Sequence, residues 1–215
     1  VYSVPATGGA PVQLNDVPLD IRAQTFQISP DGSRVVYFGA PGGGGADVPY
    51  SVPIGGPASA SVPLVENADE TASVRGTTIS PDGAYVVYVS DWDTDNVFEL
   101  YSVPVDGPAS DTRKLSVPLA EGGDVDFEFE ISPDSQYVVY QADAEADTVN
   151  ELYSVPITGP AGDSAKLHHD MVNDGFGSIS GDDVHLYAIS PDSSTVLFVA
   201  SWYTSCSAGA QPTTY

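Results

Sequence analysis

Short runs of alternating apolar and polar residues, separated by turn residues, extend along the chain and predict β-strands. Two such runs end in Phe26-Gln27-Ile28 and Phe129-Glu130-Ile131, where apolar residues take every second position. Ser-Pro-Asp follows and opens a turn, because proline fixes φ and aspartate bonds its own backbone. A β-branched and aromatic run such as Val86-Val87-Tyr88 comes next. No segment shows a helical period with capping residues, so the pattern predicts an all-β protein.

Two tetrapeptides recur along the chain with nearly the same period. Tyr-Ser-Val-Pro recurs with steps of 48, 51 and 52 residues, starting at Tyr2, Tyr50, Tyr101 and Tyr153. Ile-Ser-Pro-Asp recurs with steps of 51, 52 and 58 residues, starting at Ile28, Ile79, Ile131 and Ile189. The isoleucine lies nine positions before the aromatic residue that ends the next apolar run in all four repeats, at Tyr37, Tyr88, Tyr140 and Phe198. The chain is therefore predicted to contain about four repeats of about 51 residues.

Each repeat predicts four short strands. The turn after the first strand is completed by Gly32 and Gly83 in repeats one and two, where glycine tolerates positive φ, and by Ser135 and Ser193 in repeats three and four. The third strand runs from Glu99 to Val103 in repeat two and ends at Pro104, and the fourth lies around Lys114-Leu115. In repeat three the fourth strand lies around Lys166-Leu167. Four antiparallel strands repeated at this spacing are typical of a propeller blade, not of a sandwich.

The pattern Ile-Ser-Pro-Asp-Gly…Val-Val-Tyr…Glu-Leu-Tyr-Ser-Val-Pro is fullest from Ile79 to Pro104. It resembles the TolB-like (WD-repeat-like) β-propeller family, and the resemblance covers essentially the whole chain. The resemblance implies a propeller fold, but it leaves function open, because such propellers serve as scaffolds, as receptors and as appendages of hydrolases. Together with the start at Val1 without Met, it favours a periplasmic or extracellular location.

Residues 1–215 are predicted to form a single β-propeller domain, or a four-repeat portion of a larger propeller. The chain begins at a third strand, Tyr2, and its last marked strand is a second strand ending at Phe198. Propellers of the resembled family often close by pairing strands from both termini in one blade. Joining the ends places Tyr2 19 positions past Phe198, against 13 in the other repeats, so a four-bladed ring is arithmetically possible. A ring of six to eight blades is the alternative.

The charge excludes several partners. The chain has 6 Lys and Arg residues against 30 Asp and Glu residues, and its formal net charge is −24. Nucleic acids and anionic membranes are repelled by such a surface. No run of about 18 apolar residues occurs, so direct membrane insertion is excluded as well. We expect a protein partner or a larger assembly instead.

The loops between the second and third strands of repeats two and three share one acidic pattern. Carboxylates occupy loop positions 1, 3, 5 and 9, at Asp91, Asp93, Asp95, Glu99, Asp143, Glu145, Asp147 and Glu151. Alternate acids in a tight loop converge their oxygens, which suits a hard cation, so the pattern predicts Ca²⁺ sites. The same positions in repeats one and four carry no carboxylate, with Ala40, Gly42, Gly44 and Val48 in one and Ser201, Tyr203, Ser205 and Gly209 in the other. The alternative is a solvated acidic hairpin loop that binds no metal.

No motif for nucleophilic catalysis is present: the Gly-x-Ser-x-Gly elbow is absent, and Cys206 has no cationic residue near it in the sequence. We therefore predict a non-catalytic, extracytoplasmic binding or scaffold subunit. The alternative is a metal-dependent polysaccharide lyase or hydrolase that uses His168, His169 and His185, since imidazole suits Zn or Mn. A further alternative is the propeller portion of a prolyl-oligopeptidase-type hydrolase.

Overall fold

The computed structural model describes residues 1–15, 19–20, 26–41, 48–65, 73–147, 149–168 and 182–202. These residues form antiparallel β-sheets, and their only helices are single 3-10 turns: η1 (Ala58–Ala60), η2 (Ala109–Asp111) and η3 (Ala161–Asp163). The all-β prediction is confirmed. None of the described helices has the length and apolarity needed to cross a membrane.

Repeats two and three each form a complete four-stranded blade. The sheet of repeat two has the spatial order β11-β10-β9-β8, with β8 (Val74–Ile79), β9 (Tyr85–Ser90), β10 (Glu99–Pro104) and β11 (Arg113–Lys114). The sheet of repeat three has the order β12-β13-β14-β15, with β12 (Val125–Ile131), β13 (Tyr137–Ala142), β14 (Glu151–Pro156) and β15 (Ala165–Lys166). The predicted succession of four strands is therefore confirmed in repeats two and three.

Repeat one also forms a blade, and each end of the described chain forms a smaller sheet. In the first blade β5 (Arg34–Pro41) pairs with both β3 (Leu19–Asp20) and β4 (Phe26–Ile28), followed by β6 (Val48–Pro53) and β7 (Val62–Pro63). One end sheet consists of β1 (Tyr2–Ser3) and β2 (Val12–Gln13). The other consists of β16 (Asp182–Ile189) and β17 (Val196–Trp202).

The tyrosine of Tyr-Ser-Val-Pro fixes the register between second and third strands. In each complete blade it pairs directly with the aromatic residue that ends the apolar run of the second strand. The two rings stack with centroids 5.7, 5.6 and 5.5 Å apart, in the pairs Tyr37–Tyr50, Tyr88–Tyr101 and Tyr140–Tyr153. Stacked aromatic pairs on one face of a sheet stabilise its register, because a shift of one residue in the pairing of the two strands would separate the rings.

Consecutive blades pack face to face through apolar side chains. Val87, Val89 and Leu100 of the second blade belong to one cluster with Tyr153 and Val155 of the third. Each of these side chains is at least 95% buried. Burying a side chain of this size contributes about 1.5–3 kcal/mol, so the contact between neighbouring blades is a large part of the stability.

The Ser-Pro-Asp turns are held by the same hydrogen bonds in every repeat. In the turn of repeat three, Ser132 Oγ donates to Asp134 Oδ1 at 2.6 Å, and the Gln136 amide donates to the same oxygen at 3.1 Å. Ser135, which lies between Asp134 and Gln136, has φ +60°, and its hydroxyl accepts the Asp82 amide of the preceding blade at 3.0 Å. The turns therefore also join neighbouring blades.

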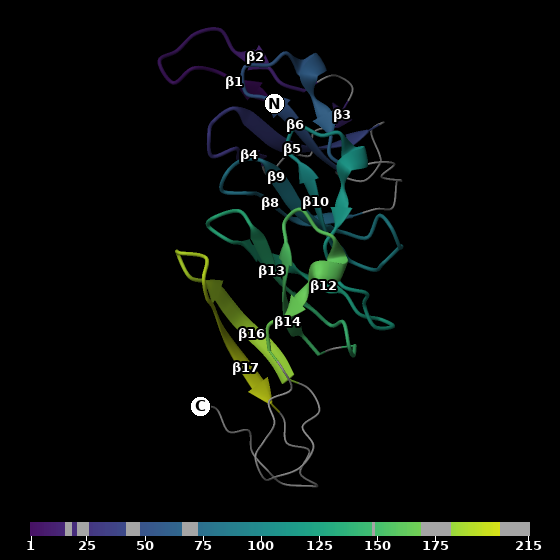
Figure 1. Cartoon of the computed structure of the whole chain (residues 1–215). Coiled ribbons are helices and arrows are strands. Elements are labelled where there is room, and N and C mark those ends of the chain that lie inside the picture. The colour runs from purple at the N-terminus through teal and green to yellow at the C-terminus, as the bar shows by residue number, and fades with distance from the viewer. Residues whose placement is uncertain are drawn as a thin grey trace, which may run out of the picture.

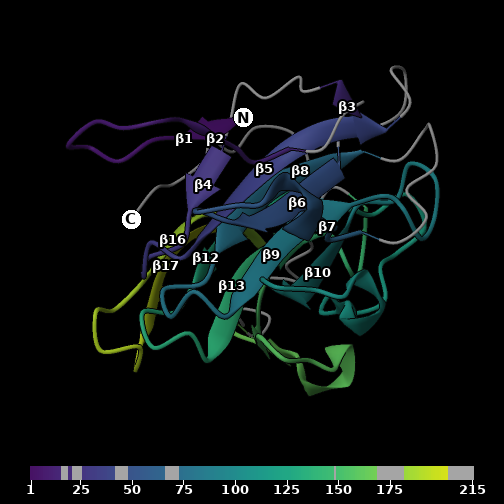
Figure 2. The same cartoon turned by 90° about the horizontal axis from the view of Figure 1, so that it is seen from above.

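The blades follow one another along an arc with the two end sheets at its opposite ends (Figure 1). The view from above shows the sheets stacked one behind the other (Figure 2). Sheet β1–β2 packs on the first blade through Leu14, and β16–β17 packs on the third blade through Val184. The predicted closure by pairing of the N- and C-terminal strands is not formed by the described strands.

Candidate functional site

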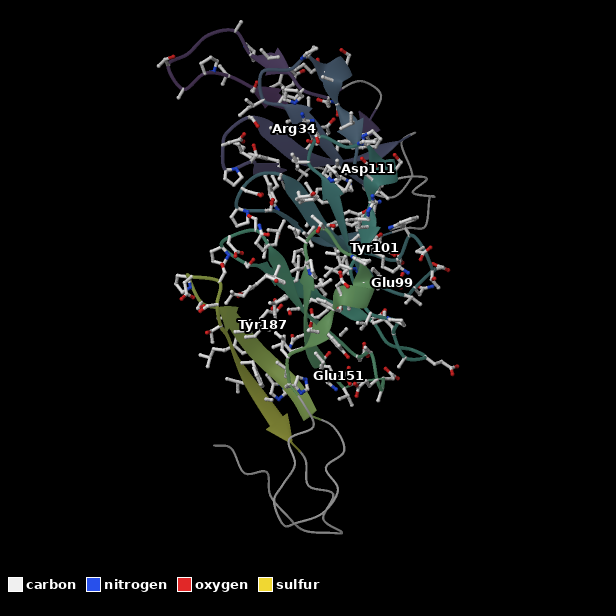
Figure 3. All side chains as sticks on the ribbon, viewed as in Figure 1. Arg34, Glu99, Tyr101, Asp111, Glu151 and Tyr187 are labelled. Atoms are coloured by element: carbon white, nitrogen blue, oxygen red, sulfur yellow. The ribbon has the colours of Figure 1, made fainter. Side chains whose placement is uncertain are left out.

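The two acidic loops occupy equivalent places in neighbouring blades. Residues 91–98 join β9 to β10, and residues 143–150 join β13 to β14. The strands run up and down in turn, so these loops share one end of the blades with the connections between repeats, and the Ser-Pro-Asp turns lie at the other end. We call the surface formed by residues 91–98, 143–147 and 149–150 the loop face. Figure 3 shows Glu99 and Glu151, which end the two loops, on adjacent blades.

The first aspartate of each loop fixes the start of a first strand. Asp91 Oδ1 accepts the Ser73 amide at 2.6 Å, just before β8. In the next blade Asp143 Oδ1 accepts the Asp124 amide, just before β12. Asp91 is 6% exposed, so its carboxylate faces the protein. These two predicted metal ligands therefore bind backbone donors within their own blades.

Lysine from the fourth strand binds the acidic loop of the second blade. Lys114 Nζ lies 2.7 Å from Asp93 Oδ2 and 2.7 Å from Glu99 Oε1. The second oxygen of Glu99 accepts the Tyr101 hydroxyl at 2.8 Å. Loop positions 3 and 9 thus converge as the sequence pattern predicted, with an ammonium group between them.

The third blade repeats the arrangement with looser geometry. Lys166 Nζ lies 2.9 Å from Glu145 Oε2 but 4.0 Å from Glu151 Oε1. Glu151 Oε2 instead accepts the Ala144 amide at 2.9 Å and the Glu145 amide at 3.3 Å. Glu151 is 3% exposed, so backbone amides supply most of the solvation that its carboxylate has lost.

Burial and charge change the proton affinity of these groups. Burial lowers the pKa of Lys114, but its hydrogen bonds to Asp93 and Glu99 outweigh burial and raise the pKa above its usual value. Burial, followed by the hydrogen bond to Glu99, raises the pKa of the Tyr101 hydroxyl. In the third blade burial raises the pKa of Glu151, against the opposing effect of its amide donors and Lys166.

The outer carboxylates of the loops face solvent. Asp95 and Asp147, at loop position 5, are exposed, as are Asp93 and Glu145 at position 3. Within the described ranges, no three His, Cys, Asp or Glu residues form a group that could hold a metal ion. The Ca²⁺ sites therefore stay a prediction, and the contacts present in the two loops are with lysine and backbone amides.

The corresponding loops of repeats one and four fall largely outside the described residues. In repeat one, Ala40 and Val48 are buried where the acidic loops carry carboxylates, and residues 42–47 lie outside the description. In repeat four the backbone of Ser201 is described as part of β17, and Tyr203, Ser205 and Gly209 lie outside it. Cys206 lies outside it as well.

The histidines proposed for the enzymatic alternative occupy different environments. His168 is 4% exposed, and its ring lies 6.0 Å from that of Phe198, in the packing between the third and fourth repeats. His185 is exposed on β16 and lines a pocket of about 370 Å³ together with Glu130 and Tyr187. His169 lies outside the described residues.

The two lysines are the site residues that the sequence reasoning missed. Lys114 and Lys166 are the only lysines of the chain and are 52 positions apart, as are Glu99 and Glu151. This shared spacing was visible in the sequence, and it pairs each lysine with the acidic loop of its own blade. A second missed signal is the repeated Gly-Pro-Ala at Gly56, Gly107 and Gly159, which begins the 3-10 turns.

Solved structures of other proteins share this fold. A protein from Agrobacterium tumefaciens assigned as TolB matches with a TM-score of 0.50 and 20% identity, over 93% of this chain and 62% of its own. A prolyl endopeptidase matches with a TM-score of 0.51 and 14% identity, over 86% of this chain and 27% of its own. No family model and no curated protein matches the chain. The chain thus spans less than two thirds of both structures, and its fold is that of a TolB-like β-propeller.

Proposed function

We propose that the chain is a non-catalytic binding or scaffold module that works outside the cytoplasm and docks a protein partner on its loop face. The observation that carries this proposal is that the loop carboxylates fall into two groups, one bound inside the blade and one exposed to solvent. The inner carboxylates, such as Asp91 and Glu99, bind donors inside the blade, whereas Asp95 and Asp147 are exposed. The outer acids are therefore available to a partner at no cost to the blade.

The chemistry of the loop face favours a basic protein surface. Lys114 and Lys166 are the only lysines of the chain, and each is already bound to loop carboxylates. The exposed acids of the loop face thus add their field to a net charge of −24. Such a surface accelerates encounter with a cationic partner and repels acidic ones, and the effect falls as salt rises.

A pair of matched double variants tests where the binding charge lies. Asp95→Asn with Asp147→Asn removes two exposed acids from the loop face, and Asp111→Asn with Asp163→Asn removes two exposed acids from the 3-10 turns. A fluorescent oligolysine peptide serves as the cationic probe, with binding followed by anisotropy. We expect the loop-face variant to bind several-fold more weakly and the control variant to bind nearly as the parent does. Equal losses would mean that the bulk charge binds the peptide, and would overturn the proposal.

The enzymatic alternative predicts turnover that depends on histidine. His185 is exposed, so His185→Ala leaves the packing of the blades intact. We expect no cleavage of acidic polysaccharides by the parent chain with Mn²⁺ or Ca²⁺ present. Cleavage that disappears in His185→Ala would contradict a non-catalytic role.

A further inference from the structure

The first strands of consecutive blades lie close together and enclose a pocket. Strands β8 and β12 are edge strands of their blades, and β16 is the corresponding strand of repeat four. The Tyr187 hydroxyl of β16 donates to the Glu128 carbonyl of β12 at 3.1 Å. A side chain at Gly76 of β8 would collide with the Phe127 carbonyl of β12. The pocket of about 370 Å³ among these strands shares no residue with the loop face, so a ligand bound here is separate from the proposed protein partner.

A glutamine joins the first strands of the first and second blades. Gln27 Nε2 donates to the Thr77 carbonyl at 2.5 Å, and Gln27 Oε1 accepts the Ile79 amide at 3.1 Å. The carbonyl and the amide point to the same side of β8, because alternate residues of a strand direct their backbone groups alike. An amide side chain suits this pair of groups, since it has one donor end and one acceptor end.

A glutamate takes the position of this glutamine in the third blade. Gln27 and Glu130 each directly precede the isoleucine of Ile-Ser-Pro-Asp. Glu130 Oε2 accepts the Ile189 amide at 3.0 Å, as the glutamine oxygen accepts the Ile79 amide. The carbonyl two residues earlier is that of Tyr187, and it corresponds to the carbonyl that the glutamine nitrogen binds. An ionised carboxylate has no hydrogen to donate to this carbonyl.

Two acceptors therefore share the place of one donor. By the repeat, Glu130 Oε1 corresponds to the donor nitrogen of Gln27, and in the described part of the chain it accepts no hydrogen bond. The carbonyl of Tyr187 is the acceptor that this nitrogen would bind. A ligand with N–H groups and a positive charge satisfies both acceptors at once.

The pocket is negatively charged. Its lining includes the carboxylates Glu128 and Glu130 and contains neither lysine nor arginine. Burial, followed by the charges of three nearby carboxylates, raises the pKa of the Tyr187 hydroxyl, and these are Glu130, Asp126 and Glu128. Several negative charges thus act on one side of the pocket, which favours a cationic ligand.

The remaining lining favours an organic cation. Phe127 and Phe129 line the pocket, and Phe127 is 57% exposed, so an apolar chain can pack on its ring. The Thr77 hydroxyl also lines the pocket, and it is buried without a hydrogen-bond partner among the described residues. A Ca²⁺ ion takes about six to eight oxygen ligands and would leave the aromatic wall unused. Aromatic rings, by contrast, attract an ammonium group and its carbon chain.

We propose that this pocket binds a primary ammonium group carried on a short apolar chain. The ammonium donates to Glu130 Oε1 and to the Tyr187 carbonyl, in the place that the side-chain amide of Gln27 takes in the first blade. Glu128 adds a second negative charge, and the carbon chain packs on Phe127.

Titration of the purified 215-residue chain with n-pentylammonium tests the class of ligand. Ligand NMR in about 0.15 M salt follows binding, because this salt screens the attraction to the bulk charge of −24. Two matched probes each lack one feature: n-pentyltrimethylammonium has the charge without N–H donors, and 1-pentanol has no charge. We expect both to bind about tenfold more weakly than n-pentylammonium. Equal binding of n-pentyltrimethylammonium would overturn the proposal, because charge alone would then attract the ligand.

Glu130→Gln tests the position of the ammonium group. Its amide can donate to the Tyr187 carbonyl, so it should weaken n-pentylammonium binding about tenfold and leave the free energy of unfolding in urea unchanged or raised. Glu121→Gln is the control, because it removes an exposed acid outside the pocket, and it should bind the probe as the parent does. Equal losses of affinity in the two variants would overturn the proposal, since the bulk charge would then bind the probe.

A second variant and a competing ion complete the test. The Glu128 side chain is exposed, so Glu128→Gln should weaken binding several-fold without changing the unfolding in urea. Unchanged affinity in this variant would contradict the placement of the ligand between the two carboxylates. A Glu130→Gln chain that unfolds more easily than the parent would contradict the equivalence with Gln27. Ca²⁺ that displaces n-pentylammonium at equal concentration would overturn the proposal, because the pocket would then be a metal site.

Discussion

The acidic loops of the second and third blades carry the same pattern of carboxylates, yet they neutralise it differently. In the second blade Lys114 lies 2.7 Å from both Asp93 and Glu99. In the third blade Lys166 lies 2.9 Å from Glu145 but 4.0 Å from Glu151. In the loop of the second blade, which we call the second loop, the buried Glu99 is therefore bound by an ammonium group. In the loop of the third blade, the third loop, the buried Glu151 is bound chiefly by backbone amides.

The difference shows that the same pattern of carboxylates can be stabilised in two ways, chiefly by an ion pair with lysine or chiefly by hydrogen bonds from backbone amides. A glutamate paired with lysine stabilises the fold mainly through its negative charge. A buried glutamate that accepts hydrogen bonds from backbone amides can keep much of that interaction when its charge is removed. The raised pKa of Glu151 agrees with this distinction, since burial is its largest cause. Substitutions that remove charge and keep shape should therefore affect the two loops unequally.

The largest expected difference between the loops comes from replacing each glutamate by glutamine. Glu99→Gln removes the charge beside Lys114 and should lower the free energy of unfolding by about 1–2 kcal/mol, less than for a fully buried pair because the Lys114 side chain is 36% exposed. Glu151→Gln keeps an oxygen for the amides of Ala144 and Glu145, and should change stability by less than about 0.5 kcal/mol. Urea unfolding of both variants measures the difference.

Asp93→Asn is the matched control for the charge of the second loop. Its partner Lys114 keeps Glu99, and the Asp93 side chain is 47% exposed, so we expect a smaller loss than for Glu99→Gln. Equal losses in Glu99→Gln and Glu151→Gln would contradict the comparison, because they would mean that the lysine distance has no effect on stability.

Much of the fold could be predicted from the sequence, because the repeat shows each local rule several times. Tyr50, Tyr101 and Tyr153 mark the predicted third strands, and in the structure they stack on the aromatic residues that end the apolar runs of the predicted second strands. The turn residues Ser135 and Ser193 take positive φ, as glycine does at the same place in repeats one and two. These features depend on neighbours in sequence or on one adjacent strand.

Closure and the chemistry of the loops were harder to predict for physical reasons. Whether the strand of Tyr2 meets that of Phe198 depends on the small rotation between blades summed over the arc, which no single residue sets. The convergence of acids such as Asp93 and Glu99 was predicted from their spacing, but the group between them was not. Lys114 lies on another strand, and only the pairing of β10 with β11 brings it to the loop.

Calcium gives the next test of the comparison, with a smaller expected effect. Ca²⁺ must displace the Lys114 ammonium from two close oxygens in the second loop, and meets a looser contact at Glu151 in the third. With a dissociation constant of about 10⁻³ M and about three times that concentration of free ion, the gain is about 0.8 kcal/mol. We therefore expect a small rise in melting temperature that Glu145→Gln removes and Asp93→Asn leaves. No rise at millimolar Ca²⁺ would contradict the calcium prediction for both loops.

The smallest expected effect is a pH dependence confined to the third loop. Burial raises the pKa of Glu151 in the folded state, so between the unfolded and folded pKa values the folded chain binds a proton that the unfolded chain has lost. The charge of Glu151 therefore costs stability at neutral pH, and that cost disappears as the pH falls through the folded pKa. The Ser-Pro-Asp turns act in the opposite sense, because hydrogen bonds led by that from Ser29 lower the pKa of Asp31 to about 2. Their stabilisation is complete above the unfolded pKa of about 3.9 and is lost as the pH falls towards 2.

Melting temperatures of the parent and Glu151→Gln between pH 7 and pH 2 separate these two contributions. As the pH falls from neutral towards the unfolded pKa of glutamate, about 4.3, we expect the parent to gain stability relative to Glu151→Gln, because only the parent loses the cost of a buried charge. Below about pH 4 both chains should lose stability together, because both keep the turn aspartates such as Asp31. A difference in melting temperature between the two chains that stays constant over the whole range would mean that Glu151 binds its proton equally well in the folded and the unfolded chain. The charge of Glu151 would then cost no stability, and the proposed difference between the two loops would be wrong.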